Sequence, residues 1–252
     1  MNQHKLTSML ISMAMVFFLI SCGGNGSGEK SNTDTSAATT DTSASTMTTP
    51  APVNTIVTSP QNMLVVTHKV KDFAKWLASY DGHDSARRAY GLHDYVVARG
   101  FNDSNMVMVA LRADDMAKAK AFTKDPSLKK AMDKGGVMGV PTISYYVAAW
   151  QDTSALGPDV LRSRTTFSVK DWDAWVKGFD DGKQERLDNG ISTRVYGHDA
   201  DDNKKVTLVT AVTDTAKAFA YYKSDALKKR REASGVIGEP KRFLFKIAKR
   251  YY

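Results

Sequence analysis

The sequence predicts an α+β protein built from two tandem βαββαβ modules, which is the ferredoxin-like order of strands and helices. The chain has 252 residues, of which 25% are charged and 42% hydrophobic, and this is the composition of a folded protein. The segment 67–141 recurs without a gap as 166–240, and about a third of the aligned positions are identical, which indicates a duplication. Both copies show the same succession of strand and helix patterns.

Each element of the first copy has a local signal. The predicted elements are, in order, a strand at 63–70, a helix after Asp72, strands at 92–100 and 106–112, a helix after Asp114 or Asp115, and a strand at 142–150. Asp72 can cap the first helix, whose apolar face carries Phe73, Trp76, Leu77 and Tyr80. The second helix is interrupted by Pro126 and ends at the glycines 135–136, and the segment 101–105 is a hairpin turn.

The repeat also predicts how the chain divides into domains. The two modules are expected at 62–150 and 151–252. A single unit of this kind leaves one face of its four-stranded sheet bare, and two tandem units can cover these faces with each other. We therefore expect a monomer in which the two sheets face one another as an intrachain pseudo-dimer. Two separately folded domains are the alternative.

Several short motifs recur at the same places in both copies. A strand leads into V-K-D-aromatic at 70–73 and 169–172, a tryptophan follows three residues later, and G-V-x-G-x-P stands before the last strand at 136–141 and 235–240. In these motifs the chain resembles the dimeric α/β-barrel superfamily. The resemblance implies that the two modules form an α/β-barrel. It implies no single activity, because the superfamily includes cofactor-free monooxygenases, isomerases and haem-degrading enzymes.

The amino-terminal segment 1–21 predicts a signal peptide. His4 and Lys5 precede an apolar run at 9–20, which is too short to span a bilayer. The residues LISC at 19–22 resemble the lipobox of bacterial lipoproteins, and the only cysteine of the chain is Cys22. The resemblance implies cleavage before Cys22 and acylation of this residue, so that acyl chains anchor the protein stably in a membrane. The alternative is an ordinary signal peptide followed by an incidental cysteine.

The segment 22–61 is rich in serine, threonine, glycine and alanine, and it predicts a disordered tether. O-glycosylation of this segment is left open. The expected location is the bacterial cell envelope, with the outer membrane preferred and the globular part outside the cytoplasm. The lipid bilayer is then a partner through Cys22. The net charge of +8 permits attraction to anionic surfaces, but an exported protein does not meet nucleic acid.

No catalytic or metal-binding motif stands out. The residues DADDN at 199–203 resemble the start of a calcium loop, but they lack the required glycine, where Lys204 stands, and the required glutamate, where Thr210 stands. A hairpin turn explains the segment fully. We therefore expect neither a metal nor another cofactor, and the sequence assigns no catalytic residue.

The barrel interior is the remaining place for a site. Period-two alternation along the strands directs six side chains into it, and these are the candidate ligand-binding residues: Tyr95, Arg99, Arg162, Arg164, Arg194 and Tyr196. Apolar walls with fixed positive charges suit a small anionic or aromatic ligand. The alternative is that these groups bridge the sheets or reach solvent. With this assignment of the strand faces, His68 faces the helices. We therefore prefer the interpretation of a core histidine over a haem or catalytic role.

Two functions remain open at this stage. The first is an envelope lipoprotein whose barrel binds a small ligand or a partner. The second is an enzyme of the cofactor-free monooxygenase, isomerase or haem-degrading type. An enzyme should gather titratable groups in one cavity, whereas a binding protein or scaffold can have a filled barrel.

Overall fold

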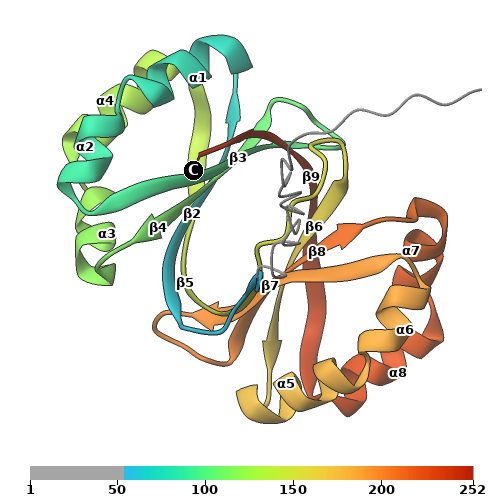
Figure 1. Ribbon diagram of the computed structural model, residues 1–252. Coiled ribbons are helices and arrows are strands. Elements are labelled where there is room, and N and C mark those ends of the chain that lie inside the picture. Colours follow the sequence, from blue (N-terminus) through green and yellow to red (C-terminus); the bar gives the residue numbers. More distant parts are fainter. Residues whose placement is uncertain (1–53, 252) are drawn as a thin grey trace, which may run out of the picture. The chain divides into compact units, whose positions relative to one another are not determined.

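The computed structural model describes residues 54–251, and these residues form an eight-stranded antiparallel barrel with helices on its outside (Figure 1). The predicted signal peptide, Cys22 and the tether up to residue 53 lie outside the described residues. The first module contains β2 (Gln61–Val70), α1 (Phe73–Asp81), α2 (Asp84–Ala89), β3 (Leu92–Gly100), β4 (Met106–Ala113), α3 (Met116–Phe122), α4 (Pro126–Gly135) and β5 (Val137–Asp152). The second contains β6 (Leu161–Val169), α5 (Trp172–Asp181), α6 (Lys183–Asp188), β7 (Ile191–Asp199), β8 (Lys205–Val212), α7 (Thr215–Tyr222), α8 (Asp225–Ala233) and β9 (Val236–Arg250).

The repeated aspartates start the helices as the sequence predicts. The Asp72 carboxylate accepts a hydrogen bond from the Lys75 backbone N–H at 2.7 Å, and Asp171 repeats this cap at the start of α5. Such a cap satisfies one of the backbone donors that a helix start leaves free, at about 1 kcal/mol. Of the two candidates for the second helix, Asp115 is the cap. Proline at 126 separates α3 from α4 rather than ending the helical region.

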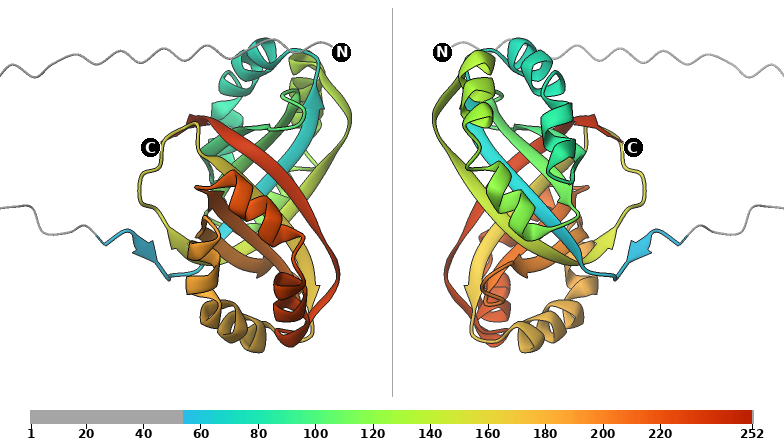
Figure 2. Two further views of the ribbon diagram at one scale, coloured as in Figure 1. Left: turned by 90° about the vertical axis from the view of Figure 1, so that its right-hand side faces the viewer. Right: turned by 90° about the vertical axis from the view of Figure 1, so that its left-hand side faces the viewer.

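The strand order confirms the intrachain barrel. Each module has the order fourth, first, third, second strand: β5-β2-β4-β3 and β9-β6-β8-β7. The fourth strand of each module then pairs with the second strand of the other, β5 with β7 and β9 with β3. Figure 2 shows the helices of the two modules at opposite ends of the molecule with the barrel strands between them.

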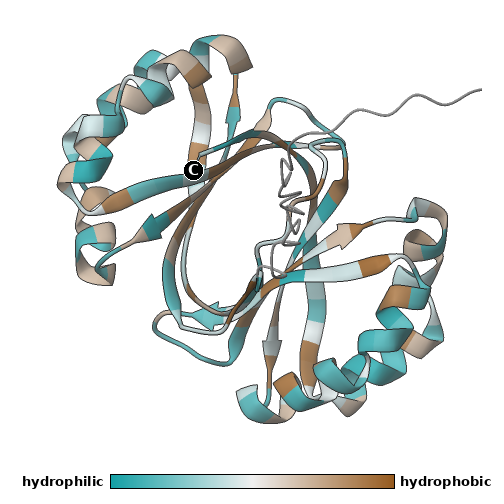
Figure 3. Ribbon diagram, viewed as in Figure 1, coloured by the Kyte–Doolittle hydropathy of each residue, from teal (hydrophilic) through white to brown (hydrophobic). Residues whose placement is uncertain are grey.

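Buried apolar side chains form two layers. One layer lies between the helices and the outer face of the sheet, where Leu64, Trp76, Val97 and Leu111 are buried in the first module. The other lies inside the barrel and includes Met63, Met108 and Phe245. Apolar residues therefore follow one another along strands such as β2 and β4, whereas the helix α8 is mostly hydrophilic (Figure 3).

Ordered structure begins before the predicted first strand. The short strand β1 (Ile56–Val57) pairs with the end of β5, and β2 starts at Gln61, so both fall in the segment predicted as tether. The last strand of the first module is also longer than the predicted 142–150, because β5 pairs with β2 from Val137 onwards and with β7 up to Gln151. Within residues 54–251, no helix is both long enough and apolar enough to cross a membrane.

Candidate functional site

Four of the six candidate residues point into the barrel. Tyr95, Arg162, Arg164 and Arg194 line an internal cavity of about 70 Å³, together with Asp152 and Arg250. The predicted alternation is therefore right for β6, the first strand of the second module, which carries Arg162 and Arg164. Arg250, on the last strand, adds a positive charge to this cavity that the sequence analysis did not include.

Arg99 and Tyr196 do not point into the barrel, and the prediction for them is wrong. The register of β3 against β4 shifts between Asp94 and Val96, and the register of β7 against β8 shifts at the equivalent place. Such a β-bulge inserts one residue and reverses the alternation beyond it. The Arg99 guanidinium consequently lies 4.3 Å from the centre of the Phe73 ring on the helix side. Tyr196 stacks on Trp150 at a ring distance of 5.6 Å, also outside the barrel.

Two of the interior arginines have structural partners. Arg194 forms an ion pair of 2.8 Å with Asp152 and donates hydrogen bonds to the hydroxyl and the carbonyl of Ser154. Arg162 donates to the carbonyl of Val160 at 2.8 Å. Both therefore hold the segment between the modules against the barrel. Burial alone would raise the pKa of Asp152, but the hydrogen bonds from Ser154 and the charge of Arg194 outweigh it and hold that pKa below its usual value.

Arg164 differs from these two arginines. Its Nε and Nη2 atoms are buried and have no hydrogen-bond partner among the described residues. Burial lowers the pKa of Arg164, while the nearby Tyr146 acts in the opposite direction. Tyr146 is itself buried, and this raises its pKa to about 12. Arg164 and Tyr146 also line a larger cavity of about 460 Å³ beside β5, β6, β8 and β9.

A second group of unsatisfied polar atoms lies outside the barrel, in the second module. A pocket of about 80 Å³ lies between the helices α5, α7 and α8 and the outer face of the sheet. We call it the basic pocket, because four arginines and no carboxylate line it: Arg186, Arg230, Arg231 and Arg242. Its remaining walls are largely aromatic and include Phe167, Trp175, Phe179, Tyr221 and Tyr222.

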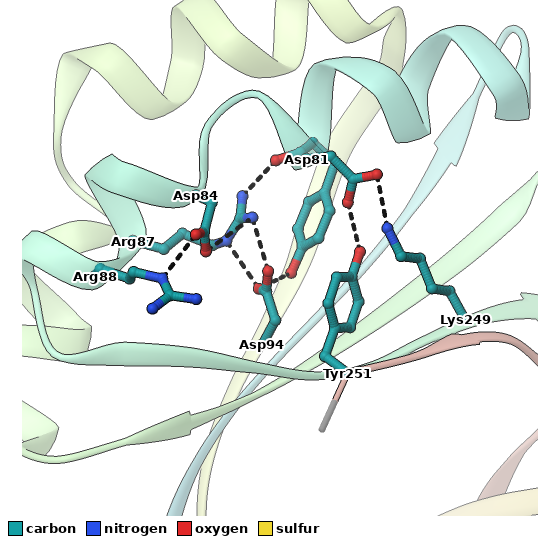
Figure 4. Close-up of polar contacts among 8 residues, drawn as sticks. Asp81, Asp84, Arg87, Arg88, Asp94, Lys249 and Tyr251 are labelled. Carbon is teal, nitrogen blue, oxygen red and sulfur yellow. Dashed lines mark hydrogen bonds and ion pairs between the residues drawn. The ribbon is translucent and has the colours of Figure 1, made fainter.

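The first module shows what Arg186 lacks. At the equivalent position, Arg87 is almost fully buried and lies 2.9 Å from Asp94, whose side chain is also buried (Figure 4). Tyr80 donates its hydroxyl hydrogen to the same carboxylate at 2.5 Å. Asp81 accepts hydrogen bonds from Lys249 and Tyr251 at the end of β9, which joins the helix α1 to the second half of the chain. The charge of Arg87 is thus neutralised inside the protein.

In the second module threonine and phenylalanine replace Asp94 and Tyr80, at positions 193 and 179. Arg186 is 7% exposed, donates to the Phe179 carbonyl and lies over the Phe179 ring, but its Nε has no partner. No carboxylate oxygen of residues 54–251 lies within 4.0 Å of its guanidinium. Burial lowers the pKa of Arg186 to about 10, even though Asp180 and Glu185 act against this at longer range. This shift corresponds to a cost of about 3 kcal/mol for keeping the charge buried.

The other three arginines of the basic pocket, unlike Arg186, have no arginine counterpart in the first module. Arg230, Arg231 and Arg242 occupy the positions of Ala131, Met132 and Ile143. Arg230 is paired with Glu185. Arg242 lies 3.6 Å above the ring of Tyr222, whose hydroxyl is buried without a partner. Burial lowers the pKa of Arg231 and that of Arg242. The second module has therefore gained positive charge around a pocket that is mainly apolar in the first.

The basic pocket is absent from the sequence predictions, although the alignment of the two copies carries a signal for it. The predictions rest on identical residues and on the barrel faces of the strands, and not on the helix-facing positions. There the loss of an aspartate at 193 and the gain of three arginines at 230, 231 and 242 stand out. A change of this kind in one copy only indicates a specialised site rather than a requirement of the fold.

His68 lies on the helix side, as predicted. It lines a small cavity of about 50 Å³ in the first module and packs on Trp76 at a ring distance of 5.4 Å. Burial lowers the pKa of His68 to about 4, so the ring is neutral at pH 7. Trp76 and its counterpart Trp175 are both buried in the core, which fits a packing role.

Comparison with known proteins shows the fold. No protein-family model and no curated protein matches the sequence. A solved structure described as an anthrone oxidase-like protein has a TM-score of 0.53 and 14% sequence identity, over 77% of this chain and 94% of that chain. A candidate monooxygenase from Fusobacterium nucleatum has a TM-score of 0.49 and 14% identity, over 75% and 93%. A haem-binding protein from Thermus thermophilus has a TM-score of 0.46 and 11% identity, over 77% and 93%.

At these identities the likeness extends to the fold alone, and only the first comparison has a TM-score above 0.5. The chain shares the ferredoxin-like modules and the dimeric α/β-barrel architecture. The cavity beside His68 encloses about 50 Å³, which is too small for a haem, so it offers no haem site in this structure. Residues 54–251 contain no cluster of three or more His, Cys, Asp or Glu side chains that suits a metal ion.

Proposed function

We propose that this chain is a lipid-anchored envelope protein that binds a small anionic molecule in the basic pocket of its second module. The observation that carries the proposal is the unneutralised, buried Arg186. A protein gains nothing in stability from a buried charge without a partner, and an anion that binds beside it offsets the cost. The aromatic walls favour a ligand with an apolar or aromatic body.

The size of the pocket limits the ligand. The enclosed space of about 80 Å³ is smaller than the engineered cavity of 150 Å³ that binds benzene. It accommodates a carboxylate or a similarly compact anionic group as it stands. A ring requires the side chains at the rim to move, among them Arg242, which would have to leave the Tyr222 ring. The expected ligand is therefore no larger than a single-ring aromatic carboxylate.

The proposal is tested by comparing benzoate with benzamidine, its cationic counterpart, by calorimetry on the full-length chain. The double variant Arg231→Met and Arg242→Ile restores the residues of the first module. We expect wild type to prefer benzoate and the double variant to bind it at least tenfold more weakly, since each hydrogen bond to a charged group contributes about 1.5–3 kcal/mol. Lys229→Met is the control, because it removes a charge from the exposed face of α8 without lining the pocket. Equal affinity for the two probes, or unchanged affinity in the double variant, would refute the proposal.

The membrane anchor rests on the lipobox and is tested separately. Mass spectrometry of the mature amino terminus should show an acylated Cys22, and Cys22→Ala should leave the membrane fraction. A mature protein that begins at another residue, or that carries a free Cys22 thiol, contradicts the anchor without affecting the proposed ligand.

A further inference from the structure

The two halves of the barrel are filled differently. Around β2 and β4 the interior is occupied by large apolar side chains: Met63 and Met108 pack against Phe243 and Phe245, whose rings stack at 5.9 Å. Around β6 and β8 two of the equivalent positions carry small hydroxyl side chains, Ser144 and Thr207, and the other two carry Arg162 and Tyr146. The cavity of about 460 Å³ is found here. The hydroxyl-bearing residues that line it are Thr142, Ser144, Tyr145, Tyr146, Thr166, Ser168 and Thr207.

The repeat shows which substitutions accompany this difference. Ser144 stands where the second copy has Phe243, and Thr207 stands where the first copy has Met108. Arg164 stands where the first copy has Val65, a residue buried in the apolar layer inside the barrel. One half of the duplicated barrel therefore keeps an apolar core, and the other combines open space, hydroxyl groups and one interior arginine.

Arg164 is the charge that remains unbalanced in this cavity. Towards the open end of the cavity, two positive charges, Lys205 and Lys241, are offset by two negative charges, Asp199 and Glu239, which also line it. Arg164 lies deeper, where the 460 Å³ cavity meets the inner cavity, and two of its nitrogens have no acceptor among the described residues. Buried donors in native proteins are nearly always paired, so these nitrogens indicate an acceptor that the chain itself does not supply.

We propose that this half of the barrel is a second binding site, which takes a hydroxylated carboxylate such as a sugar acid. The carboxylate accepts hydrogen bonds from Arg164, and the hydroxyl groups of the ligand bond to the threonine and serine side chains of the wall. This ligand class differs from that of the basic pocket, whose walls are aromatic. The wall is mixed, because Phe167, Val206 and Ile237 line it beside the hydroxyl groups. A purely aromatic body would cost these hydroxyl groups their hydrogen bonds with water and give none in return.

The experiment uses calorimetry on the full-length chain with gluconate as the probe and glucose as its uncharged comparison. Wild type should bind gluconate at least tenfold more tightly than glucose. Arg164→Val, which restores the residue of the first copy, should weaken gluconate binding at least tenfold. Ser144→Phe, which introduces the residue of the second copy, should abolish binding by filling the cavity. Lys204→Asn removes an exposed charge that does not line the cavity, again with the residue of the other copy, and should change the affinity less than threefold.

Thermal unfolding gives an independent measurement on the same variants. Because Arg164 lacks a partner, Arg164→Val should raise the melting temperature in the absence of ligand, whereas removal of a structural arginine would lower it. The proposal is overturned if wild type does not bind gluconate, if Arg164→Val or Ser144→Phe binds it like wild type, or if Arg164→Val lowers the melting temperature. The double variant Arg231→Met and Arg242→Ile should bind gluconate like wild type. A failure of this proposal can therefore be distinguished from a failure of the proposed anion site in the basic pocket.

Discussion

Replacing Asp94 with threonine, the residue at this position in the second module, should destabilise the protein by about 3–5 kcal/mol, the cost of breaking a buried ion pair by removing one partner. The side chains of Arg87 and Asp94 are 3% and 8% exposed, and the carboxylate lies 2.9 Å from the guanidinium. Asp94→Thr also removes the acceptor of the Tyr80 hydroxyl. Arg87 would keep its hydrogen bond to the Tyr80 carbonyl, its place 3.8 Å from the centre of the Tyr80 ring and a 3.7 Å contact with Asp84, but no close carboxylate.

The second module supplies a check on this magnitude. Arg186 already exists without a carboxylate partner, and its lowered pKa corresponds to about 3 kcal/mol, the lower end of the expected range. For a domain of this size, a loss of 3–5 kcal/mol should lower the melting temperature by roughly 6–20 °C.

The assay is urea unfolding of the full-length chain at pH 7, followed by circular dichroism. Asp84→Asn is the matched control: it removes the same charge from the same helix–sheet region, but its side chain is 37% exposed and its closest partner, Arg88, is on the surface. The control should change the unfolding free energy by less than about 1 kcal/mol. A loss below 1 kcal/mol for Asp94→Thr, or equal effects of the two variants, contradicts the assignment of Arg87 and Asp94 as a buried pair.

Three further outcomes are expected. The pKa of His68 is about 4 in the folded protein and 6.5 in the unfolded chain, so the unfolded chain binds more protons between these pH values. Up to about 3 kcal/mol of stability is therefore lost as the pH falls from 6.5 to 4. His68→Phe, which introduces the residue of the second copy, should remove this part of the loss in urea titrations at pH 7 and 4.5. The fragment Asn54–Asp152, which keeps β1 to β5 whole, should self-associate in analytical ultracentrifugation, because β3 and β5 lose their partners β9 and β7. A stable soluble monomer argues against barrel closure as an essential contact. Thr193→Asp should give Arg186 a carboxylate and weaken benzoate binding about tenfold or more; undiminished affinity shows that Arg186 does not contribute to the site.

The fold could be predicted because the signals that specify it are local and repeated. Asp72 and its counterpart Asp171 cap helices of the same kind, and alternation along β2, β4 and β6 assigns their faces correctly. The bulges in β3 and β7 could not be predicted, since no glycine or proline marks them. They account for the two misplaced candidates, Arg99 and Tyr196.

The candidate site was only partly predictable for a different reason. Sequence places Arg162, Arg164 and Arg194 in the barrel, but it does not show that the carbonyls of Ser154 and Val160 satisfy two of them. Which arginine lacks a partner depends on the path of the segment between the modules, and this segment has no periodicity to interpret. The basic pocket, by contrast, was visible in the substitutions between the copies.

Closure of the barrel through β3 and β9 bears on how the chain reaches its native state. Val96 pairs with Arg250, a residue about 150 positions later in the chain, and contacts between such distant segments form slowly because a long loop must close first. During synthesis the barrel stays open until β9 has left the ribosome, and β3 meanwhile presents an unpaired edge. In the exported lipoprotein proposed above, slow closure would keep the chain unfolded during its transport. The same open edge is a place where a holding chaperone can act before the strands meet.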